Sequence, residues 1–405
     1  MEYTILDNDK VRGYIQDTPE LMAILGEGEL SIQEVGDGNL NYVYIVESSK
    51  SKIILKQAVP YLRIAGEGWP LSRERMNYEI RALSYFREIA PSFIPTIYHA
   101  NEEMSVVALR FLENHIIMRR GLMEGIRYPK FAEQITDFLA ASLLKSSSLY
   151  LSSESKRALM DRFNTNTQLC KISEDFIFTF PYMEHDSNNI NPKMVSVQKE
   201  LQNDTEFKVQ MLKLKYLFMN QSDALLHGDL HTGSIMLNKD ETYVIDPEFA
   251  FFGPFGFDIG ALIANLLQSY VSHFERTRDS DYQQWLLETV EAIFVKFEAK
   301  FLDHWNRTDE SALIAHGYAD EAVLASFQKQ FMEMIFRQSV GFAGAKMARR
   351  LFGIAGVEDI TGIDDPDARA RVEKKSLAIA KRFVKEYEKI GNVKELIGMI
   401  KQESE

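Results

Sequence analysis

The 405-residue chain contains a single cysteine, Cys170. A disulfide bond within the chain is therefore impossible, and such cysteine usage is typical of a reducing compartment, so we expect a cytoplasmic location. Basic runs are also lacking: no stretch of Lys and Arg exceeds two or three residues, and the formal net charge is −13. Proteins that bind nucleic acid through its phosphates usually carry a basic surface, so nucleic-acid binding is not expected.

An uninterrupted apolar run is missing as well. The most apolar stretch covers residues 249–267, and Pro254, Asp258 and three glycines interrupt it. We expect a buried segment there rather than a membrane span. The first residues, MEYTILDNDK, carry three acidic side chains and no apolar core, so a signal peptide is not expected either. With 45% hydrophobic and 26% charged residues, the composition is that of a globular protein.

The N-terminal part of the chain predicts a small lobe of antiparallel strands. Short segments rich in Ile, Val and Tyr, separated by Gly, Asn and Ser, are typical of strands. Ser72 is a candidate N-cap for a helix that should end before Pro91. Around that helix we expect five strands, over residues 31–35, 42–47, 52–58, 96–100 and 105–111.

The rest of the chain predicts mostly helices, because apolar residues recur there at three- and four-residue spacing. The expected helices lie near residues 130–150, 195–219, 258–275, 280–303, 321–351 and 367–390. Strand-like segments are limited to 225–226, 235–237 and 242–245, and residues 186–192 have the composition of a loop. The sequence therefore predicts an α+β fold of two lobes. Residues 1–112 form the smaller N-terminal lobe and residues 113–405 the larger helical lobe.

Two features of the first lobe point to a phosphate site. The turn Gly36-Asp37-Gly38-Asn39 lies between two predicted strands, where glycines let backbone amides approach a phosphate. Lys56 ends an apolar run one strand later, and its ammonium is suited to hold phosphates as a point charge. Glu79, on the following helix, is placed to pair with Lys56. Seen alone, a hairpin turn and a surface lysine explain these features as well.

The segment HGDLHTGS, residues 227–234, brings two imidazoles and a carboxylate together between apolar strands. Asp229 is suited to accept or orient the proton of an attacking hydroxyl in phosphoryl transfer. A metal site formed by His227 and His231 is an alternative, although no H-E-x-x-H helix or cysteine pair accompanies them. A turn capped by Asp and His is the other alternative.

Asp246 and Glu248 follow the apolar pair Val244-Ile245. Because they are two positions apart, both carboxylates face the same side of an extended segment. Hard oxygen ligands beside a phosphate site are what Mg²⁺ requires, so the pair is a candidate metal site. A solvated acidic turn is the alternative for this pair alone.

The order of these features along the chain makes them informative together. A glycine turn, a strand lysine, an HGDLH loop and an Asp-x-Glu strand end predict kinase-type phosphoryl transfer with ATP and Mg²⁺. The segment from Asp229 to Asp246 leaves room for one short hairpin. Such a hairpin would bring both carboxylates to one edge of a cleft.

Longer strings of the sequence resemble one family. GDGNLNYVY, LKQAVPY and GEGWPL in the first lobe, with HGDLHTGSI, VIDPEFAF and GFAG followed by RR in the second, are similar to the methylthioribose kinases. That family lies within the aminoglycoside phosphotransferase and choline kinase group, and the resemblance spans residues 31–360. It implies a protein-kinase-like bilobal fold and a homodimer. It also implies ATP-dependent phosphorylation of the 1-hydroxyl of 5-methylthioribose, a step of methionine salvage.

The resemblance assigns roles by position. It makes Asp229 the catalytic base and a sugar contact. It gives Asp246 and Glu248 to Mg²⁺ and, through the metal, to the nucleotide phosphates. The backbone of the linker between the lobes is expected to lie against the adenine. The implied ATP-binding residues are Asn39, Lys56, Arg110, Phe111, Leu112, Asp246, Pro247 and Glu248.

The resemblance also implies a sugar-site role for Arg349 and Arg350. Guanidinium groups bind sugar hydroxyls and stabilise charge on a transferring phosphoryl group. From the residues alone, such a pair at a helix end equally complements the helix dipole or lies in solvent.

Residues 59–71 resemble a family loop that carries Trp69 over the nucleotide side of the cleft, and its glycines suit a mobile lid. Core packing of Trp69 is the alternative.

Two positions depart from the wider pattern. Many relatives carry an acidic pair in the linker, where this chain has Arg110-Phe111-Leu112-Glu113. Backbone recognition of adenine survives this change, but side-chain contacts do not carry over. Ser234 stands where related kinases have a metal-binding Asn, and we expect Glu248 to supply the missing oxygen.

Two other functions stay open at this point. One is a kinase for a different small alcohol, such as choline, homoserine or an aminoglycoside. Arg349 and Arg350 disfavour a cationic acceptor if they line the pocket. The other is a nucleotide-binding scaffold without turnover, but Lys56, Asp229 and the Asp246–Glu248 pair are all present.

Overall fold

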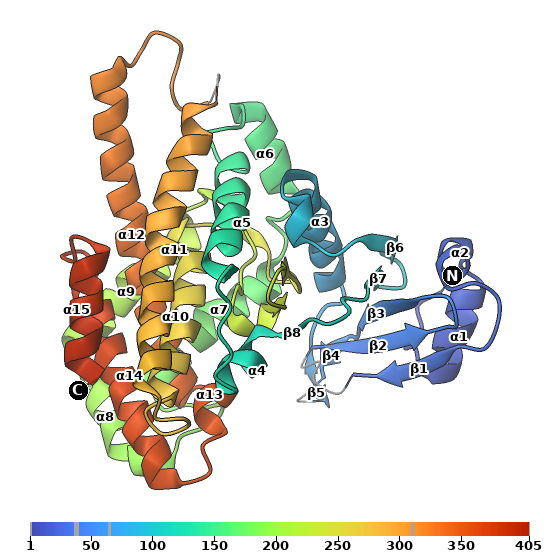
Figure 1. Ribbon diagram of the computed structural model, residues 1–405, viewed down its shortest axis with the longest axis horizontal. Coiled ribbons are helices and arrows are strands. Elements are labelled where there is room, and N and C mark those ends of the chain that lie inside the picture. The colour runs from blue at the N-terminus through green and yellow to red at the C-terminus, as the bar shows by residue number, and fades with distance from the viewer. Residues whose placement is uncertain (1, 36–39, 64–65, 309–311, 405) are drawn as a thin grey trace.

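The computed structural model describes residues 2–35, 40–63, 66–308 and 312–404. It has a small lobe built on a β-sheet and a larger helical lobe (Figure 1). The α+β, protein-kinase-like arrangement of two lobes expected from the sequence is therefore confirmed.

The sheet of the small lobe has five strands, and all neighbours are antiparallel. Its order is β1-β2-β3-β7-β6, so the two C-terminal strands add to the edge of a three-stranded meander. The strands are β1 (Ser31–Glu34), β2 (Asn41–Glu47), β3 (Lys52–Ala58), β6 (Ile97–Asn101) and β7 (Val106–Arg110). Each lies within about a residue of its predicted range. The predicted turn 36–39, including Asn39, lies outside the described residues.

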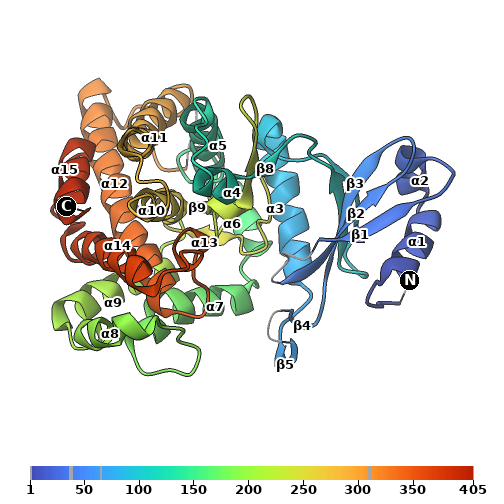
Figure 2. The same ribbon diagram turned by 60° about the horizontal axis from the view of Figure 1, so that its bottom comes forward.

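Two short helices that the sequence did not predict precede the sheet, α1 (Asn8–Gln16) and α2 (Pro19–Leu25). Asp7 caps α1 by accepting a hydrogen bond from the Lys10 amide, and Pro19 opens α2. Their apolar side chains share a buried core with residues of the sheet. Both helices cover the side of the sheet that faces away from the helical lobe (Figure 2).

Helix α3 (Arg75–Ile89) lies between the sheet and the helical lobe (Figure 2). It ends before Pro91, as expected, but its N-cap is Glu74 rather than Ser72. Ser72 instead accepts a hydrogen bond from the Glu74 amide at 3.2 Å, which fixes the turn before the helix. The segment between β3 and α3 forms a hairpin of β4 (Tyr61–Leu62) and β5 (Gly66–Pro70).

The chain passes between the lobes after β7. The next strand, β8 (Ile116–Ile117), pairs with β10 (Ile235–Leu237) of the larger lobe, and β10 pairs with β11 (Thr242–Val244). Residues 112 and 113 lie in this connection. A second short ladder joins β9 (Ala224–Leu226) to β12 (Phe251–Gly253).

The larger lobe is mainly helical, and its helices close around the short ladders. The helices are α4 (Met118–Met123), α5 (Phe131–Lys145), α6 (Ser153–Asp161), α7 (Thr167–Phe178), α8 (Val195–Gln202), α9 (Thr205–Asn220), α10 (Gly256–Ser272), α11 (Ser280–Asn306), α12 (Glu321–Phe352), α13 (Glu358–Thr361), α14 (Pro366–Glu386) and α15 (Val393–Ser404). The single helix expected over 195–219 is two helices, because Asp204 interrupts it. Its side chain caps α9 by accepting from the Phe207 amide at 3.0 Å.

Helix α10 is the centre of this lobe, and every one of its residues is buried. It packs against α11, α12 and α14. The apolar stretch noted in the sequence, residues 249–267, comprises β12 and most of α10 and is almost entirely buried, as expected. No helix among residues 2–35, 40–63, 66–308 and 312–404 is long and apolar enough to cross a bilayer.

The GFAG string lies in α12 at a close approach of helices. A Cβ on Gly344 would lie 2.8 Å from the carbonyl oxygen of Ala380 on α14. A Cβ on Gly341 would lie 2.7 Å from the side chain of Leu214 on α9. These glycines let α12 pack directly on its neighbours, and this packing fixes the last turns of α12.

Candidate active site

The HGDLH loop connects β9 to β10, and its backbone is hydrogen-bonded to Asp258 of α10. The Asp258 carboxylate accepts hydrogen bonds from the His227 amide at 2.6 Å and from the Gly228 amide at 3.1 Å. Gly228 has a φ of 84°. A Cβ there would lie 2.1 Å from the Phe249 carbonyl oxygen, so only glycine fits.

His227 supports the loop from the other side. Its Nε2 donates to the Ile245 carbonyl at 2.8 Å, and its Nδ1 accepts from the Asp229 amide at 3.3 Å. Because both ring nitrogens are used, His227 has none left for a metal. The ring ties the Asp229 segment to Ile245, which lies between β11 and the acidic pair.

Asp229 is held by two side chains. Lys346 Nζ lies 2.8 Å from one carboxylate oxygen, and His231 Nε2 lies 3.3 Å from the other. His231 Nδ1 accepts from the Gly233 amide at 2.9 Å, so the ring proton is on Nε2 and points to Asp229. Burial lowers the pKa of His231 to about 4, so the imidazole is neutral near pH 7.

Asp229 is ionised in this environment. Burial on its own would raise the pKa of its carboxyl group, but Lys346, His231 and Arg350 together hold that pKa well below the ordinary value. The carboxylate is therefore available as a hydrogen-bond acceptor throughout the neutral range.

Three cations on one face of α12 interact electrostatically with Asp229. Lys346, Arg349 and Arg350 are spaced i, i+3 and i+4, which places them on one side of the helix. Lys346 and Arg349 are buried, at 3% and 8% exposed. Burial lowers the pKa of all three, and the two arginines lower the pKa of Lys346 further. Asp229 alone does not balance these charges, so the site is suited to an anionic group.

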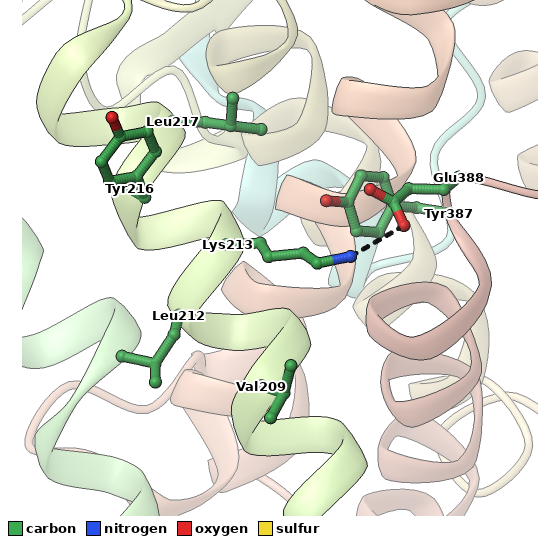
Figure 3. Close-up of a pocket in the computed structure, with 7 residues that line it drawn as sticks. All are labelled: Val209, Leu212, Lys213, Tyr216, Leu217, Tyr387 and Glu388. Carbon is green, nitrogen blue, oxygen red and sulfur yellow. Dashed lines mark hydrogen bonds and ion pairs between the residues drawn. The ribbon is translucent and has the colours of Figure 1, made fainter.

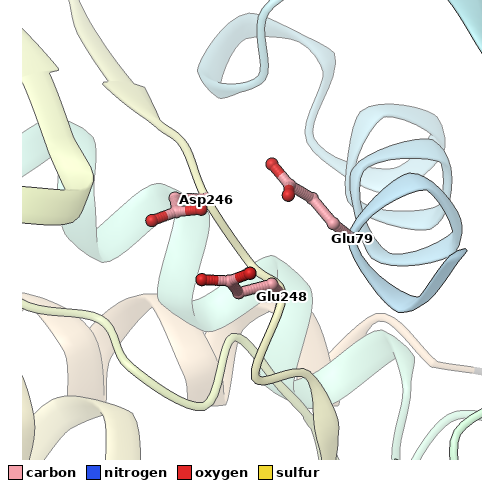
Figure 4. A group of neighbouring side chains, drawn as sticks. All are labelled: Glu79, Asp246 and Glu248. Carbon is pink, nitrogen blue, oxygen red and sulfur yellow. The ribbon is translucent and has the colours of Figure 1, made fainter. Parts of the chain in front are cut away.

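The second half of the site is a cluster of three carboxylates. Glu79, Asp246 and Glu248 each offer an oxygen, and these oxygens lie within 4.8 Å of one another. Glu79 comes from α3, opposite the segment that carries Asp246 and Glu248 (Figure 4). Asp246 has a φ of 67°, an uncommon backbone conformation for a residue other than glycine.

Lys56 joins this cluster from β3. Its Nζ lies 2.9 Å from Glu79 Oε1 and also forms a short ion pair with Asp246. Burial opposes the charge of Lys56, but the carboxylates of Asp246, Glu79 and Glu248 raise its pKa above the ordinary value. The pairing of Lys56 with Glu79 that the sequence indicated is present in the structure.

Asn41 and Arg75 complete the surroundings of Glu248, and neither was selected from the sequence. Asn41 donates to Glu248 Oε2 at 2.8 Å, and Arg75 Nε lies 3.6 Å from the same oxygen. Arg75 is 2% exposed and also donates to the carbonyls of Leu40 and Val59. No sequence signal marked it, because an arginine in the first turn of a helix ordinarily lies in solvent.

The carboxylate cluster carries more negative than positive charge. Burial, and then the neighbouring carboxylate of Asp246, raise the pKa of Glu248, although Lys56 and Arg75 oppose the shift. Three carboxylates face these two cations, so one negative charge remains in the cluster. A bound divalent cation would neutralise it. The donor set is all oxygen, so it fits Mg²⁺.

The remaining expected ATP contacts lie on the linker. Arg110 is the last residue of β7, and its guanidinium reaches the Tyr243 hydroxyl at 3.4 Å. Lys52 Nζ lies 4.9 Å from the centre of the Phe111 ring. Leu112 is buried. The structure thus places the Arg110 and Phe111 side chains against protein groups.

Trp69 lies in β5 next to Pro70, which pairs with Tyr61 of β4, and is half-buried. Its ring centre is 5.9 Å from that of Phe176 on α7, so the hairpin of the small lobe contacts the large lobe. Phe176 in turn packs edge-on against Phe180 at 5.2 Å. Trp69 is therefore an inter-lobe contact rather than a residue of either core.

A groove of about 510 Å³ lies elsewhere, between α9 and the end of α14 (Figure 3). Its lining is mainly apolar, with one ion pair between Lys213 and Glu388 at 3.1 Å. It contains none of the residues of the site described above, so it is not the active site.

Comparison with known proteins defines the class. The model of the phosphotransferase enzyme family matches residues 31–293. The chain is therefore a phosphotransferase. Methylthioribose kinase 1 of Oryza sativa subsp. japonica is 40% identical over 402 residues, which cover 96% of this chain and 94% of the relative. Methylthioribose kinase of Escherichia coli O45:K1 is 40% identical over 392 residues, 94% of each chain. Within the phosphotransferases, the chain belongs to the methylthioribose kinase family.

Similarity to solved structures is more distant. A choline kinase from Cryptosporidium parvum Iowa II is 13% identical to the chain, with a TM-score of 0.47, and the match covers 93% of this chain and 96% of that one.

Proposed function

We propose that the chain transfers the γ-phosphoryl group of ATP to the 1-hydroxyl of 5-methylthioribose, giving 5-methylthioribose 1-phosphate and ADP in methionine salvage. The observation that carries the proposal is the position of Asp229. It lies among Lys346, Arg349 and Arg350 in a chain that matches named methylthioribose kinases along almost its whole length.

In the proposed step Asp229 accepts the proton of the sugar 1-hydroxyl. The O–H bond breaks as that oxygen bonds to the γ-phosphorus, and the bond from the γ-phosphorus to the bridging oxygen of ADP breaks. A carboxylate with a depressed pKa is a weak base in the ground state. It is suited to orient the hydroxyl first and to take the proton late, as the hydroxyl becomes acidic in a loose transition state.

Arg349 and Arg350 contribute positive charge where the transferring group carries negative charge. The Nε atom of each guanidinium group is buried and has no hydrogen-bond partner among the residues that the structure describes. Buried donors that do not first have to break another hydrogen bond need no reorganisation when charge develops in the transition state. The same excess of positive charge disfavours choline and aminoglycosides as acceptors.

The nucleotide side is assigned to Lys56, Asn39 and the linker 110–112. Lys56 is held rigidly by Glu79, which fixes its ammonium for the α- and β-phosphates. Asp246 and Glu248 would hold Mg²⁺, with Pro247 between them at the nucleotide. A bound Mg²⁺ would neutralise negative charge on the nucleotide phosphates.

ADP release tests the proposal. The purified chain is incubated with ATP, with and without Mg²⁺, and with 5-methylthioribose, ribose, choline, homoserine or kanamycin in turn. We expect Mg²⁺-dependent turnover with 5-methylthioribose and little with the rest. Turnover with another acceptor alone would reject the substrate assignment. ATP binding without turnover on any acceptor would favour a scaffold function.

We further propose a homodimer in the cytoplasm, acting without nucleic acid or membrane partners. The family resemblance supports the dimer, and the single cysteine supports a reducing compartment. An exposed apolar stripe on α9 offers a surface for the second copy. The stripe consists of Val209, Leu212, Tyr216 and Met219.

A further inference from the structure

Beside Asp229 lies a group of buried polar atoms that have no hydrogen-bond partner among the described residues. The group comprises the Nε atoms of Arg119, Arg349 and Arg350 and both carboxylate oxygens of Asp359. Buried polar atoms are ordinarily hydrogen-bonded, and a buried carboxylate with no donor is costly. Several such atoms at one place indicate that a polar ligand completes their contacts.

Asp359 comes from the short helix α13 and is 1% exposed. Its backbone carbonyl accepts from Arg276 Nε at 2.7 Å, and its carboxylate faces Arg119 of α4, whose Nε lies 3.5 Å from Asp359 Oδ2. This separation is too long for a hydrogen bond, so Arg119 orients the carboxylate without satisfying it. Burial raises the pKa of Asp359, and Arg119 opposes the shift.

A series of contacts leads from Asp359 back to Asp229. Arg119 Nη2 lies 3.4 Å from His231 Nδ1, and His231 Nε2 lies 3.3 Å from Asp229. Arg350 interacts electrostatically with both Asp229 and Asp359. Asp359 therefore belongs to the same site as the proposed catalytic base, on the far side of His231 and Arg119.

Asn265 of the buried helix α10 fixes this arrangement. Its Oδ1 accepts from Arg119 Nη2 at 3.1 Å, and its Nδ2 donates to the Ala261 carbonyl at 3.0 Å. The Arg119 guanidinium is thus held from one side by a rigid helix. Asp359 is correspondingly fixed, and a ligand that meets it does so in a defined geometry.

The chemistry of the unpartnered atoms indicates the ligand. A carboxylate only accepts hydrogen bonds, and a guanidinium only donates them. A hydroxyl does both, so two adjacent hydroxyls satisfy an acceptor and a donor placed side by side. A ring with vicinal hydroxyls fits this arrangement, whereas a hydrocarbon or a cationic amine leaves donors or acceptors unsatisfied.

We propose that Asp359, oriented by Arg119, accepts hydrogen bonds from the 2- and 3-hydroxyls of the acceptor sugar and makes the site selective for a ribose-type diol. This inference rests on the proposed phosphorylation of 5-methylthioribose. It assigns the recognition of the ring hydroxyls to an element, α13, separate from the one that carries the base.

The test compares 5-methylthioribose with its 2-deoxy and 3-deoxy analogues. For the unmodified chain we expect kcat/KM to fall by about 10²-fold or more for at least one analogue, because a site built to bind a hydroxyl rejects a substrate without it. In Asp359→Asn we expect kcat/KM for 5-methylthioribose to fall while that for the analogue stays nearly constant. The discrimination ratio then drops at least about tenfold, with an unchanged KM for ATP.

Glu358→Gln is the matched control, since Glu358 is the exposed neighbour on α13. It should keep the ratio of the unmodified chain. Equal turnover of all three sugars by the unmodified chain would overturn the inference but not the proposed function, whatever the folding of the variants. An equal loss on all three sugars in Asp359→Asn would show a purely structural role. No turnover of 5-methylthioribose by the unmodified chain would overturn both proposals.

Discussion

Asp229 accepts hydrogen bonds from an ammonium and a neutral imidazole, and each holds one of its carboxylate oxygens. Replacing Asp229 with Asn keeps the shape of the side chain but removes the proton acceptor. We expect kcat to fall by about 10²–10⁴-fold, the typical contribution of a general base. The Kd for ATP, measured by calorimetry, should stay close to that of the unmodified chain. Near-normal kcat would contradict the assignment of Asp229.

Lys346 is the closest cation to Asp229 and is almost completely buried. Lys346→Met fills the same space without the charge, so the pKa of Asp229 should rise. Protonation of Asp229 would then stop turnover at a higher pH than in the unmodified chain. We expect a lower kcat and an acidic limb of the kcat–pH profile that moves to higher pH. Lys346→Arg should move the limb less.

A lower kcat in Lys346→Met with an unmoved acidic limb would contradict this role, because a packing defect alone does not titrate. Phe257 provides a check of the packing, since Lys346 Nζ also lies 4.7 Å from the centre of its ring. Lys346→Met also removes this cation–π contact, and that loss by itself is expected to change stability only modestly. By itself it should not move the acidic limb of the kcat–pH profile.

The sequence predicted several of these residues and missed others for physical reasons. Lys56 and Glu79 could be paired in advance, because a strand lysine and a following helix have a recurrent geometry. Lys346 was missed, although its spacing from Arg349 and Arg350 places it on the same helix face and could have revealed it. Arg119 and Asp359 had no such signal, because they come from short helices far apart in the chain.

At the scale of elements, the position of α12 decides where its cations lie. The helix packs directly on α10 and α14, and Gly344 makes the approach to α14 possible. A small shift of α12 would move Lys346 and both arginines relative to Asp229. The glycines in the middle of α12 therefore serve the site through packing.

Gly344→Ala tests this packing. The added methyl group would lie 2.8 Å from the Ala380 carbonyl oxygen, so we expect a loss of about 1–3 kcal/mol in the free energy of unfolding. Gly398→Ala in α15 is the control, because nothing lies within 4 Å of its Cβ position. Alanine should stabilise that helix by about 0.5–1 kcal/mol. Urea unfolding curves measure both changes, and an equal response of the two variants would contradict the packing argument.

Most elements followed from apolar spacing, and the exceptions have clear causes. The strands of the first sheet and the long helices α10, α11 and α12 were predicted close to their observed bounds. Helices α1, α2, α4, α6, α7, α13 and α15 were missed. Several are too short to show a helical repeat; α2, for example, has only seven residues. The break between α8 and α9 was missed, because the capping by Asp204 is visible only once the turn exists.

At the scale of the whole molecule, the site lies where the two lobes meet. Lys56 and Glu79 come from the small lobe, whereas Asp246 and Glu248 come from the large lobe. Trp69 adds a second contact between the lobes, on Phe176 of α7. The order of the motifs in the sequence predicted that residues of both lobes form one site. The distances between these residues could be known only from the folded structure.

The proposed homodimer is tested by the mass in solution. The stripe on α9 exposes Leu212 at 64% and Tyr216 at 68%, which is unfavourable unless a partner covers them. We expect a mass twice the 46.6 kDa of one chain in sedimentation equilibrium, and that of one chain for Leu212→Glu. Tyr318→Glu changes a side chain that is 79% exposed and lies outside the stripe, and this variant should stay dimeric. A monomeric unmodified chain would reject the dimer.

The most direct test of the central claim is to identify the product. The chain is incubated with ATP, Mg²⁺ and 5-methylthioribose, and the phosphorylated sugar is examined by ³¹P and ¹H nuclear magnetic resonance. We predict a phosphate coupled to the anomeric proton, as in a 1-phosphate, formed in step with ADP. A phosphate on another oxygen, or ADP released without a phosphorylated sugar, would contradict the proposed reaction.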